Sequence, residues 1–176
     1  LLESGEIAAL SYWDMVYSAL GAMGLEMRKL DDPATGDFPS NGFVARREAL
    51  DSPERAAALA AVARGYAMGS IYADAHPEEA AQIYFRHFPQ TRAQGLTLEE
   101  DIAAVLPVLA AATQLWGPRP GSEQRGVGDV AQYQAYIDWL QGRGVLEGAV
   151  TAEQIVDNSL QEAIQDFDPA LAANPN

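Results

Sequence analysis

The sequence predicts an α/β protein that is mostly helical over its 176 residues. Two short apolar runs, residues 7–10 and 41–45, have the composition of strands, and longer segments after residue 52 carry apolar residues at helical spacing. A run that is apolar at every position, such as 7–10, is typical of a strand in a sheet covered on both faces. Because the sequence offers too few other strands to partner it, we expect most of the sheet to lie upstream of Leu1. We therefore expect this chain to be the C-terminal part of a larger protein.

The composition excludes several classes of function. Acidic residues number 25 against 11 basic ones, and the net charge of −14 repels phosphate backbones and anionic membrane surfaces. We therefore expect no nucleic-acid partner. The absence of cysteine excludes a disulfide, a thiolate zinc site and a thiol nucleophile. With 48% hydrophobic and 20% charged residues, the composition is that of a globular domain.

The first elements alternate between helix and strand. Residues 13–23 have helical spacing of apolar side chains and end at Gly24, which favours a helix terminus. Residues 25–30 alternate apolar and charged side chains, which predicts a short, half-exposed strand. Residues 31–40 contain two prolines and a glycine among polar residues, so we interpret them as a linker that leads into the strand at 41–45.

The remaining sequence predicts a series of helices. Pro53, directly after Ser52, is a typical helix start, and Thr97 and Thr151 each open a capping box with a Glu or Gln three residues later. The predicted helices span residues 53–73, 77–88, 98–116, 129–141 and 152–167.

Apolar stripes on these helices predict which side chains form the core. On the first of the series the stripe consists of Leu59, Val62, Tyr66 and Ile71. On the helix at 129–141 it consists of Val130, Tyr133, Ile137 and Leu140.

The residues that usually carry chemistry are few. His76 and His87, the two histidines, lie at opposite ends of one predicted helix, about three turns apart, and cannot hold one metal together. The acidic pairs, such as Glu78 and Glu79, lie at helix starts or in turns, where the helix macrodipole favours them. No phosphate-binding loop or nucleophile elbow is present. We therefore predict no catalytic residue, no metal and no cofactor.

Tyr12, Trp13 and Asp14 are the strongest candidates for a binding site. They follow the predicted strand at 7–10 where a helix begins, which is where open α/β folds bind ligands. The two rings offer stacking faces and the carboxylate an acceptor or counter-charge. The alternative is that Trp13 packs as core and Asp14 only caps the helix. Ser40 and Asn41, at the end of the linker, could likewise donate to a ligand or simply form a tight turn.

Several segments together carry a resemblance. Residues 2–10 contain a Gly-x-Ile-x-Ala strand, and residues 53–65 form a helix that begins with Pro and ends in Ala-x-x-x-Gly. Residues 76–81 read His-Pro-Glu-Glu-Ala-Ala, residues 133–144 are an amphipathic helix with a glycine turn, and residues 155–157 read Ile-Val-Asp. In this order the segments resemble the solute-binding proteins of ABC importers of the nitrate, sulfonate, taurine and thiamine-precursor type.

The resemblance implies a two-lobe, type II periplasmic-binding-protein fold. Residues 1–32 would then end the second lobe, residues 33–45 would form the crossover or hinge and a strand, and residues 46–176 would be the helical part that returns to the first lobe. The implied protein is a monomer with a signal peptide upstream. It is periplasmic or lipid-anchored at the outer face of the cytoplasmic membrane.

In the family, the two lobes close on a small-molecule solute and deliver it to an ABC permease in the membrane. The family has an aromatic residue, often Trp, at the ligand-side turn after this strand, which fits Trp13. We therefore predict that Tyr12, Trp13, Asp14, Ser40 and Asn41 bind the ligand. The carboxylate of Asp14 disfavours nitrate or sulfonate and favours an aromatic, heterocyclic or amine-bearing solute.

Two alternatives to the transport function stay open. The first is a pyrimidine-synthesis enzyme of the same fold, for which a reacting histidine and a metal-binding or cysteine-rich site are expected. The second is an all-helical interaction domain, in which residues 7–10 are helical and residues 31–40 are an ordinary loop.

Overall fold

The computed structural model describes residues 1–30, 36, 38–39, 41–117 and 124–175. None of these residues lies in a β-strand, so the predicted α/β class is wrong and the described chain is all-helical. Residues 7–10, 25–30 and 41–45 are irregular. A strand needs a neighbour that pairs its backbone N–H and C=O groups, and no described residues pair with these segments in this way. Leu10 and Val44 are exposed. An apolar run alone therefore did not make a sheet.

The chain divides into two compact units, each described here by itself. Unit 1 comprises Leu1–Lys29, Met68–Gly117 and Asp168–Asn176, and unit 2 comprises Leu30–Ala67 and Pro118–Phe167. The helix α3 (Pro53–Ala75) contributes its first part to unit 2 and its last part, from Met68, to unit 1.

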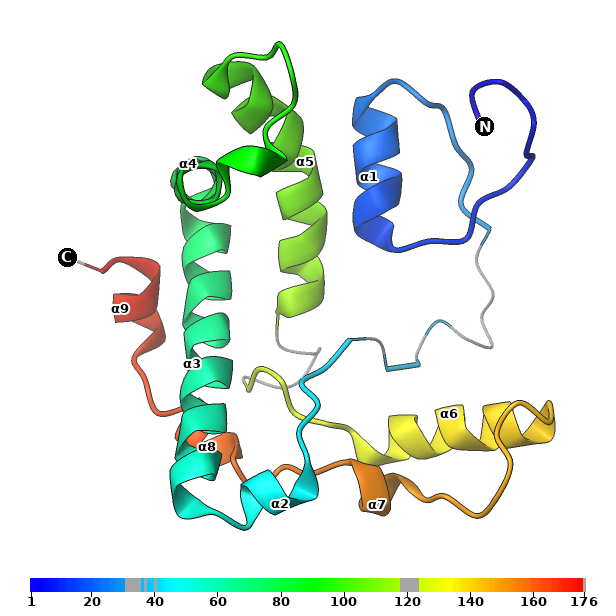
Figure 1. Cartoon of the computed structure of the whole chain (residues 1–176), viewed down its shortest axis with the longest axis vertical. Helices are drawn as coiled ribbons and strands as arrows, with labels where there is room; N and C mark the ends of the chain where they lie inside the picture. The colour runs from blue at the N-terminus through cyan, green and yellow to red at the C-terminus, as the bar shows by residue number, and fades with distance from the viewer. Residues whose placement is uncertain (31–35, 37, 40, 118–123, 176) are drawn as a thin grey trace. The chain divides into compact units, whose positions relative to one another are not determined.

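Unit 1 is built around α5. Besides the end of α3 it contains α1 (Asp14–Ala22), α4 (Pro77–His87), the 3-10 turn η1 (Pro89–Thr91), α5 (Leu98–Trp116) and α9 (Pro169–Ala173). Both α1 and α4 pack against α5, as Figure 1 shows. The buried side chains of α4 and α5 include Ala81, Phe85 and Ala112.

Local signals define the helix ends in unit 1. The Thr97 hydroxyl accepts from the Glu100 N–H at 3.3 Å, and the Glu100 carboxylate accepts from the Thr97 N–H at 2.8 Å, so the predicted capping box is confirmed. At the end of α1, Gly24 has a φ of 89°, and the Leu25 N–H returns to the Leu20 carbonyl at 3.1 Å. This left-handed turn favours glycine and ends the helix as predicted.

Unit 2 contains α2 (Arg47–Leu50), the start of α3, α6 (Val130–Gly142), α7 (Ala152–Ile155) and α8 (Gln161–Ile164). Ile137 of α6 and Ala152 of α7 are its buried apolar side chains outside α3 among the described residues. Gln134 of α6 accepts from the Ala152 N–H at 2.9 Å, which joins α6 to the start of α7. Phe38 packs against Tyr136 and Trp139 of α6 at centroid distances of 5.1 and 5.5 Å.

The single helix predicted at 152–167 is wrong, because the structure has two short helices there, α7 and α8, with a non-helical segment between them. The Asp157 carboxylate accepts from the Ser159 N–H at 2.8 Å, a local turn that competes with the helix. The Asn158 side chain is held by the backbone of Gly128. The other predicted helices are confirmed within one or two residues of their ends. None of the helices in the described part of the chain has the length and apolar character that crossing a bilayer requires.

The predicted core stripe of α3 is wrong at Val62 and Tyr66, whereas Leu59 and Ile71 are half-buried. The buried residues of this helix are small, namely Ala60, Ala63, Ala67, Ser70 and Ala73. Val62 and Tyr66 of the predicted stripe are exposed. The small side chains on one face of α3 are therefore buried, while larger apolar side chains on another face are open.

Candidate functional site

Two of the sequence-predicted ligand-binding residues form an exposed aromatic pair in unit 1. The rings of Tyr12 and Trp13 meet edge to face with centroids 5.2 Å apart, and both side chains are exposed. The Tyr17 hydroxyl accepts from the Tyr12 N–H, which holds this turn against α1. Trp13 is therefore not core. Asp14 is the first residue of α1, and its side chain lies outside the described part of the structure.

The remaining predicted residues lie elsewhere. Asn41 is exposed and belongs to unit 2, and Ser40 lies outside the described residues. Tyr12 and Asn41 thus fall in different units, and a shared ligand site stays a prediction. Of the histidines, His76 precedes α4 but makes no side-chain cap; its ring nitrogen lies 2.8 Å from the Ala173 carbonyl oxygen. Within the described ranges no cluster of His, Cys, Asp or Glu could hold a metal.

The candidate site is an exposed apolar surface on unit 2, which we call the open stripe. It consists of Val62 and Tyr66 of α3, Phe43 and Val44 of the segment before α2, and the half-buried Leu59 of α3. Exposed fractions are 65% for Phe43, 96% for Val44, 63% for Val62 and 52% for Tyr66. The Phe43 and Tyr66 rings meet edge to face at 5.5 Å. This contact joins the two parts of the stripe.

The positions of the stripe follow from how α3 is anchored. The alanine face of α3 is buried, so side chains on the other faces of the helix point outward. Within unit 2, Arg64 of α3 pairs with Asp166 at 4.0 Å. The irregular segment that carries Phe43 passes close to α6, because a Cβ built on Gly42 would lie 3.6 Å from the Tyr133 hydroxyl. Desolvation by partial burial raises the pKa of the Tyr66 phenol.

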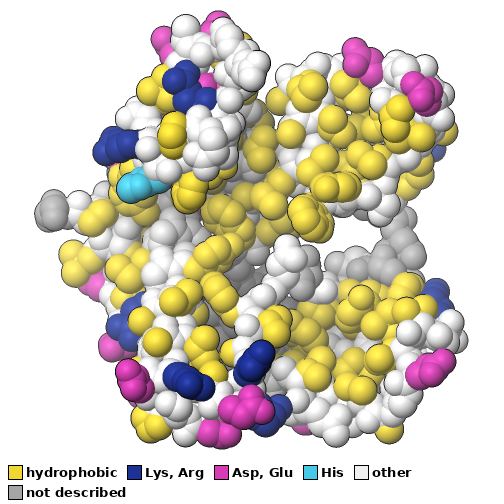
Figure 2. Space-filling view, viewed as in Figure 1, with side chains coloured by type: hydrophobic (Ala, Val, Ile, Leu, Met, Phe, Trp, Pro, Cys, Tyr) yellow, Lys and Arg dark blue, Asp and Glu magenta, His cyan; other side chains and the backbone are white. Residues whose placement is uncertain are grey.

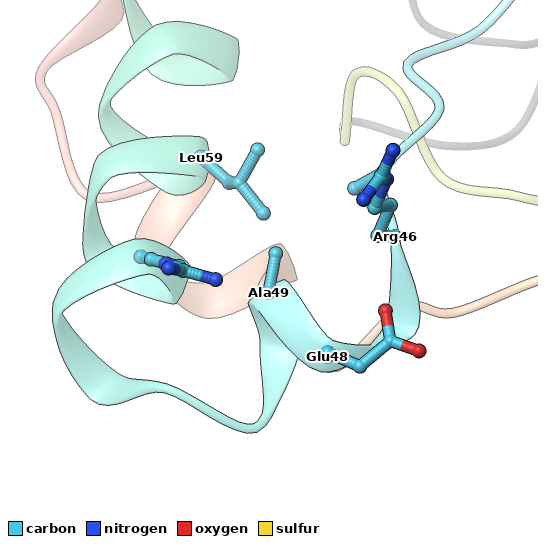
Figure 3. Close-up of a pocket in the computed structure, with 6 residues that line it drawn as sticks. Arg46, Glu48, Ala49 and Leu59 are labelled. Atoms are coloured by element: carbon cyan, nitrogen blue, oxygen red, sulfur yellow. The ribbon is translucent and has the colours of Figure 1, made fainter.

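An open hollow of about 650 Å³ lies at the start of the stripe (Figure 3). It is lined by Ala45, Arg46, Glu48, Ala49, Arg55 and Leu59. Figure 3 shows the side chains of Ala49 and Leu59 pointing toward one another, while the Glu48 carboxylate points away from Leu59. Ala49 and Leu59 thus form an apolar part of a lining that also contains charged side chains. In Figure 2 dark-blue cationic, magenta acidic and hydrophobic side chains lie next to one another over α2 and the start of α3.

The arginines around the hollow divide into two kinds. Arg47 donates to the Gln154 carbonyl oxygen at 2.7 Å and so anchors α2 to α7. The pKa of Asp157 is lowered, mainly by hydrogen bonds from Ser159 and in smaller part by the charge of Arg47. In contrast, the guanidinium groups of Arg46 and Arg55 are exposed and pair with no group in the described part of the chain. These two cations are available to a ligand.

Sequence reasoning missed this surface because it assigned the apolar stripe of α3 to the core. One signal could have revealed it. Alanines at positions 56, 60, 63 and 67 have the same three- and four-residue spacing as Leu59, Val62 and Tyr66, so α3 has two competing faces.

In comparisons with family models, with curated proteins and with solved structures, nothing matches this chain.

Proposed function

We propose that this chain is an all-helical interaction domain that binds a partner protein through the open stripe. The observation that carries the proposal is the orientation of α3, which buries alanines and leaves Val62 and Tyr66 exposed. Apolar side chains gathered on one surface favour association, because each Val or Phe that leaves water contributes about 1.5–3 kcal/mol. Aromatic side chains such as Phe43 and Tyr66 are also the types that most often anchor protein interfaces.

The thin catalytic inventory supports a binding role over an enzymatic one. The importer function that the sequence resemblance implied depends on strands and on a two-lobe sheet architecture, and the described residues contain no strand. Solute binding by Tyr12 and Trp13 stays a prediction. The interaction domain needs only the surface of unit 2.

The test places a photo-crosslinking amino acid at position 62 in the chain expressed in its own cells. Position 145 is the control, because Val145 is 69% exposed in the same unit but lies outside the stripe. A protein crosslinked at position 62 but not at 145 is then purified and titrated by calorimetry with the wild-type chain and with Val62→Glu. We expect the wild type to bind and Val62→Glu to weaken binding by about tenfold or more.

The melting temperature of the free Val62→Glu chain separates binding from stability. Because Val62 is exposed, we expect an unchanged melting temperature. A strong decrease would mean that the stripe is covered within the free chain, and equal crosslinking at positions 62 and 145 would mean that the stripe is not a preferred contact. Either result would contradict the proposal.

A further inference from the structure

We propose that the partner segment is an amphipathic helix that carries acidic residues at one end. This inference rests on the proposed function. The apolar face of the partner helix lies along the open stripe, and the acidic end of this helix meets Arg46 and Arg55 at the hollow. The inference combines the spacing of side chains on α3 with the position of the two unpaired guanidinium groups.

The spacing on α3 indicates a helical occupant. Arg55, Leu59, Val62 and Tyr66 follow one another at intervals of four, three and four residues. This is the interval at which side chains form a straight seam along a helix, and it is the repeat by which two helices interlock their side chains. A partner helix with apolar residues at the same intervals can follow the seam over about three turns.

The charge at one end of the seam indicates the chemistry of the partner. Arg55 begins the seam, and Arg46 lines the same hollow. A guanidinium group binds a carboxylate through two parallel hydrogen bonds, which are stronger than those between neutral groups. Arg47 and Arg64 show the contrast, since each is already engaged within unit 2. The free pair therefore favours glutamate or aspartate at the matching end of the partner.

A short segment fits this site better than a second copy of the chain. Two copies would bring together two net charges of −14, whereas a short helix adds only a few charges. The repulsion by distant acids decays over about 8 Å at physiological salt. Among the residues that line the hollow, the guanidinium groups of Arg46 and Arg55 outweigh the carboxylate of Glu48, so the local charge is positive. The acidic end of the helix is then attracted locally although the whole chain is strongly negative.

The experiment uses three synthetic peptides of about 18 residues, each with apolar residues at three- and four-residue intervals. They differ only at one end, which carries glutamate, glutamine or lysine, and circular dichroism is used to match their helicity. Binding to the whole chain is measured by fluorescence anisotropy. We expect the glutamate peptide to bind about tenfold more tightly than the glutamine peptide, and the lysine peptide to bind most weakly.

Variants of the chain assign this preference to the two arginines. The double variant Arg46→Ser/Arg55→Ser should bind the glutamate and glutamine peptides equally, and raising the salt concentration should have the same effect on the wild type. Arg86→Ser is the matched control, because Arg86 is exposed on α4 and lies outside the hollow. Val62→Glu should weaken the binding of all three peptides, and Val145→Glu should not.

The outcomes distinguish the inference from the function on which it rests. If the three peptides bind equally and Val62→Glu still weakens them, the acidic partner is wrong and the interaction domain stands. If no peptide binds, the helical partner is wrong, and the interaction domain stands or falls by the crosslinking at position 62. If a peptide binds and Val62→Glu does not weaken it, the peptide does not occupy the open stripe and this inference is overturned. If light scattering shows that the chain is a dimer and that Val62→Glu dissociates it, the occupant is a second copy and this inference is wrong.

Discussion

Asn158 binds the backbone of Gly128 through both ends of its side-chain amide. Its Nδ2 donates to the Gly128 carbonyl oxygen, and its Oδ1 accepts from the Gly128 N–H, both at 2.9 Å. The two residues are separated by α6 and α7 along the chain. The side-chain amide thus donates and accepts one hydrogen bond each, as a peptide group does, with a loop distant in sequence. These two bonds hold the segment between α7 and α8 in a non-helical conformation.

We expect Asn158→Ala to destabilise unit 2. The change removes both hydrogen bonds to Gly128, and a hydrogen bond contributes about 0.5–1.5 kcal/mol net. Because Asn158 is exposed, water can replace part of this loss. Urea unfolding measures the difference. Asn174→Ala is the control, because Asn174 is exposed near the C-terminus and its side chain makes no such pair; an equal effect of the two changes would contradict this role of Asn158.

The close approach of Val156 to Gly128 predicts that a change at Val156 restores stability lost by a change at Gly128. A Cβ built on Gly128 lies 2.6 Å from Cγ1 of Val156, which is too close for a real contact. Gly128→Ala should therefore destabilise by about 1–3 kcal/mol, the usual effect of overpacking. Val156→Ala removes the clashing methyl group, so the double variant should be more stable than the sum of the single effects predicts. Simple additivity in a double-mutant cycle would show that the clash is relieved elsewhere.

In unit 1 the ion pair between Arg92 and Asp101 should contribute to stability. Asp101 is buried on α5, and its carboxylate accepts from Arg92 Nε at 2.7 Å and from the Ala93 N–H at 3.2 Å. Asp101→Asn keeps the shape but removes the charge, and hydrogen bonds to charged groups contribute about 1.5–3 kcal/mol. We expect a loss of this size in chemical unfolding. Glu99→Gln, an exposed change in the same turn, should cost far less.

The capping box of α5 predicts a pH dependence. The pKa of Glu100 lies below its usual 4.5, mainly because its carboxylate accepts from the Thr97 N–H and then from the Thr97 hydroxyl. A folded-state pKa below the unfolded value means that this stabilisation is present above about pH 4.5 and is lost as the pH falls through the folded pKa. Thermal melts of the wild type and of Glu100→Gln should therefore converge as the pH decreases. A difference that stays constant down to low pH would exclude this source of stability.

The helices that sequence reasoning located correctly are those with local signals at their ends. The Ser52 and Pro53 start, the Thr97 capping box and the Gly24 terminus involve residues within a few positions of one another. Ile137 was also correctly assigned to the core. Such signals act within one or two turns of helix, so they operate whatever the rest of the chain does.

Sequence by itself determined that this is an acidic, cysteine-free and helix-rich chain, and it determined where four of the longer helices and α1 lie. Only tertiary structure decided that the apolar runs at 7–10 and 41–45 are not strands, since a strand depends on a distant partner for its hydrogen bonds. It also decided that α3 buries Ala60 and Ala63 and leaves Val62 open. Both faces of α3 satisfy the same helical spacing, and the choice between them depends on which face a neighbouring element can approach closely. The open stripe, and with it Arg46 and Arg55, follows from that choice.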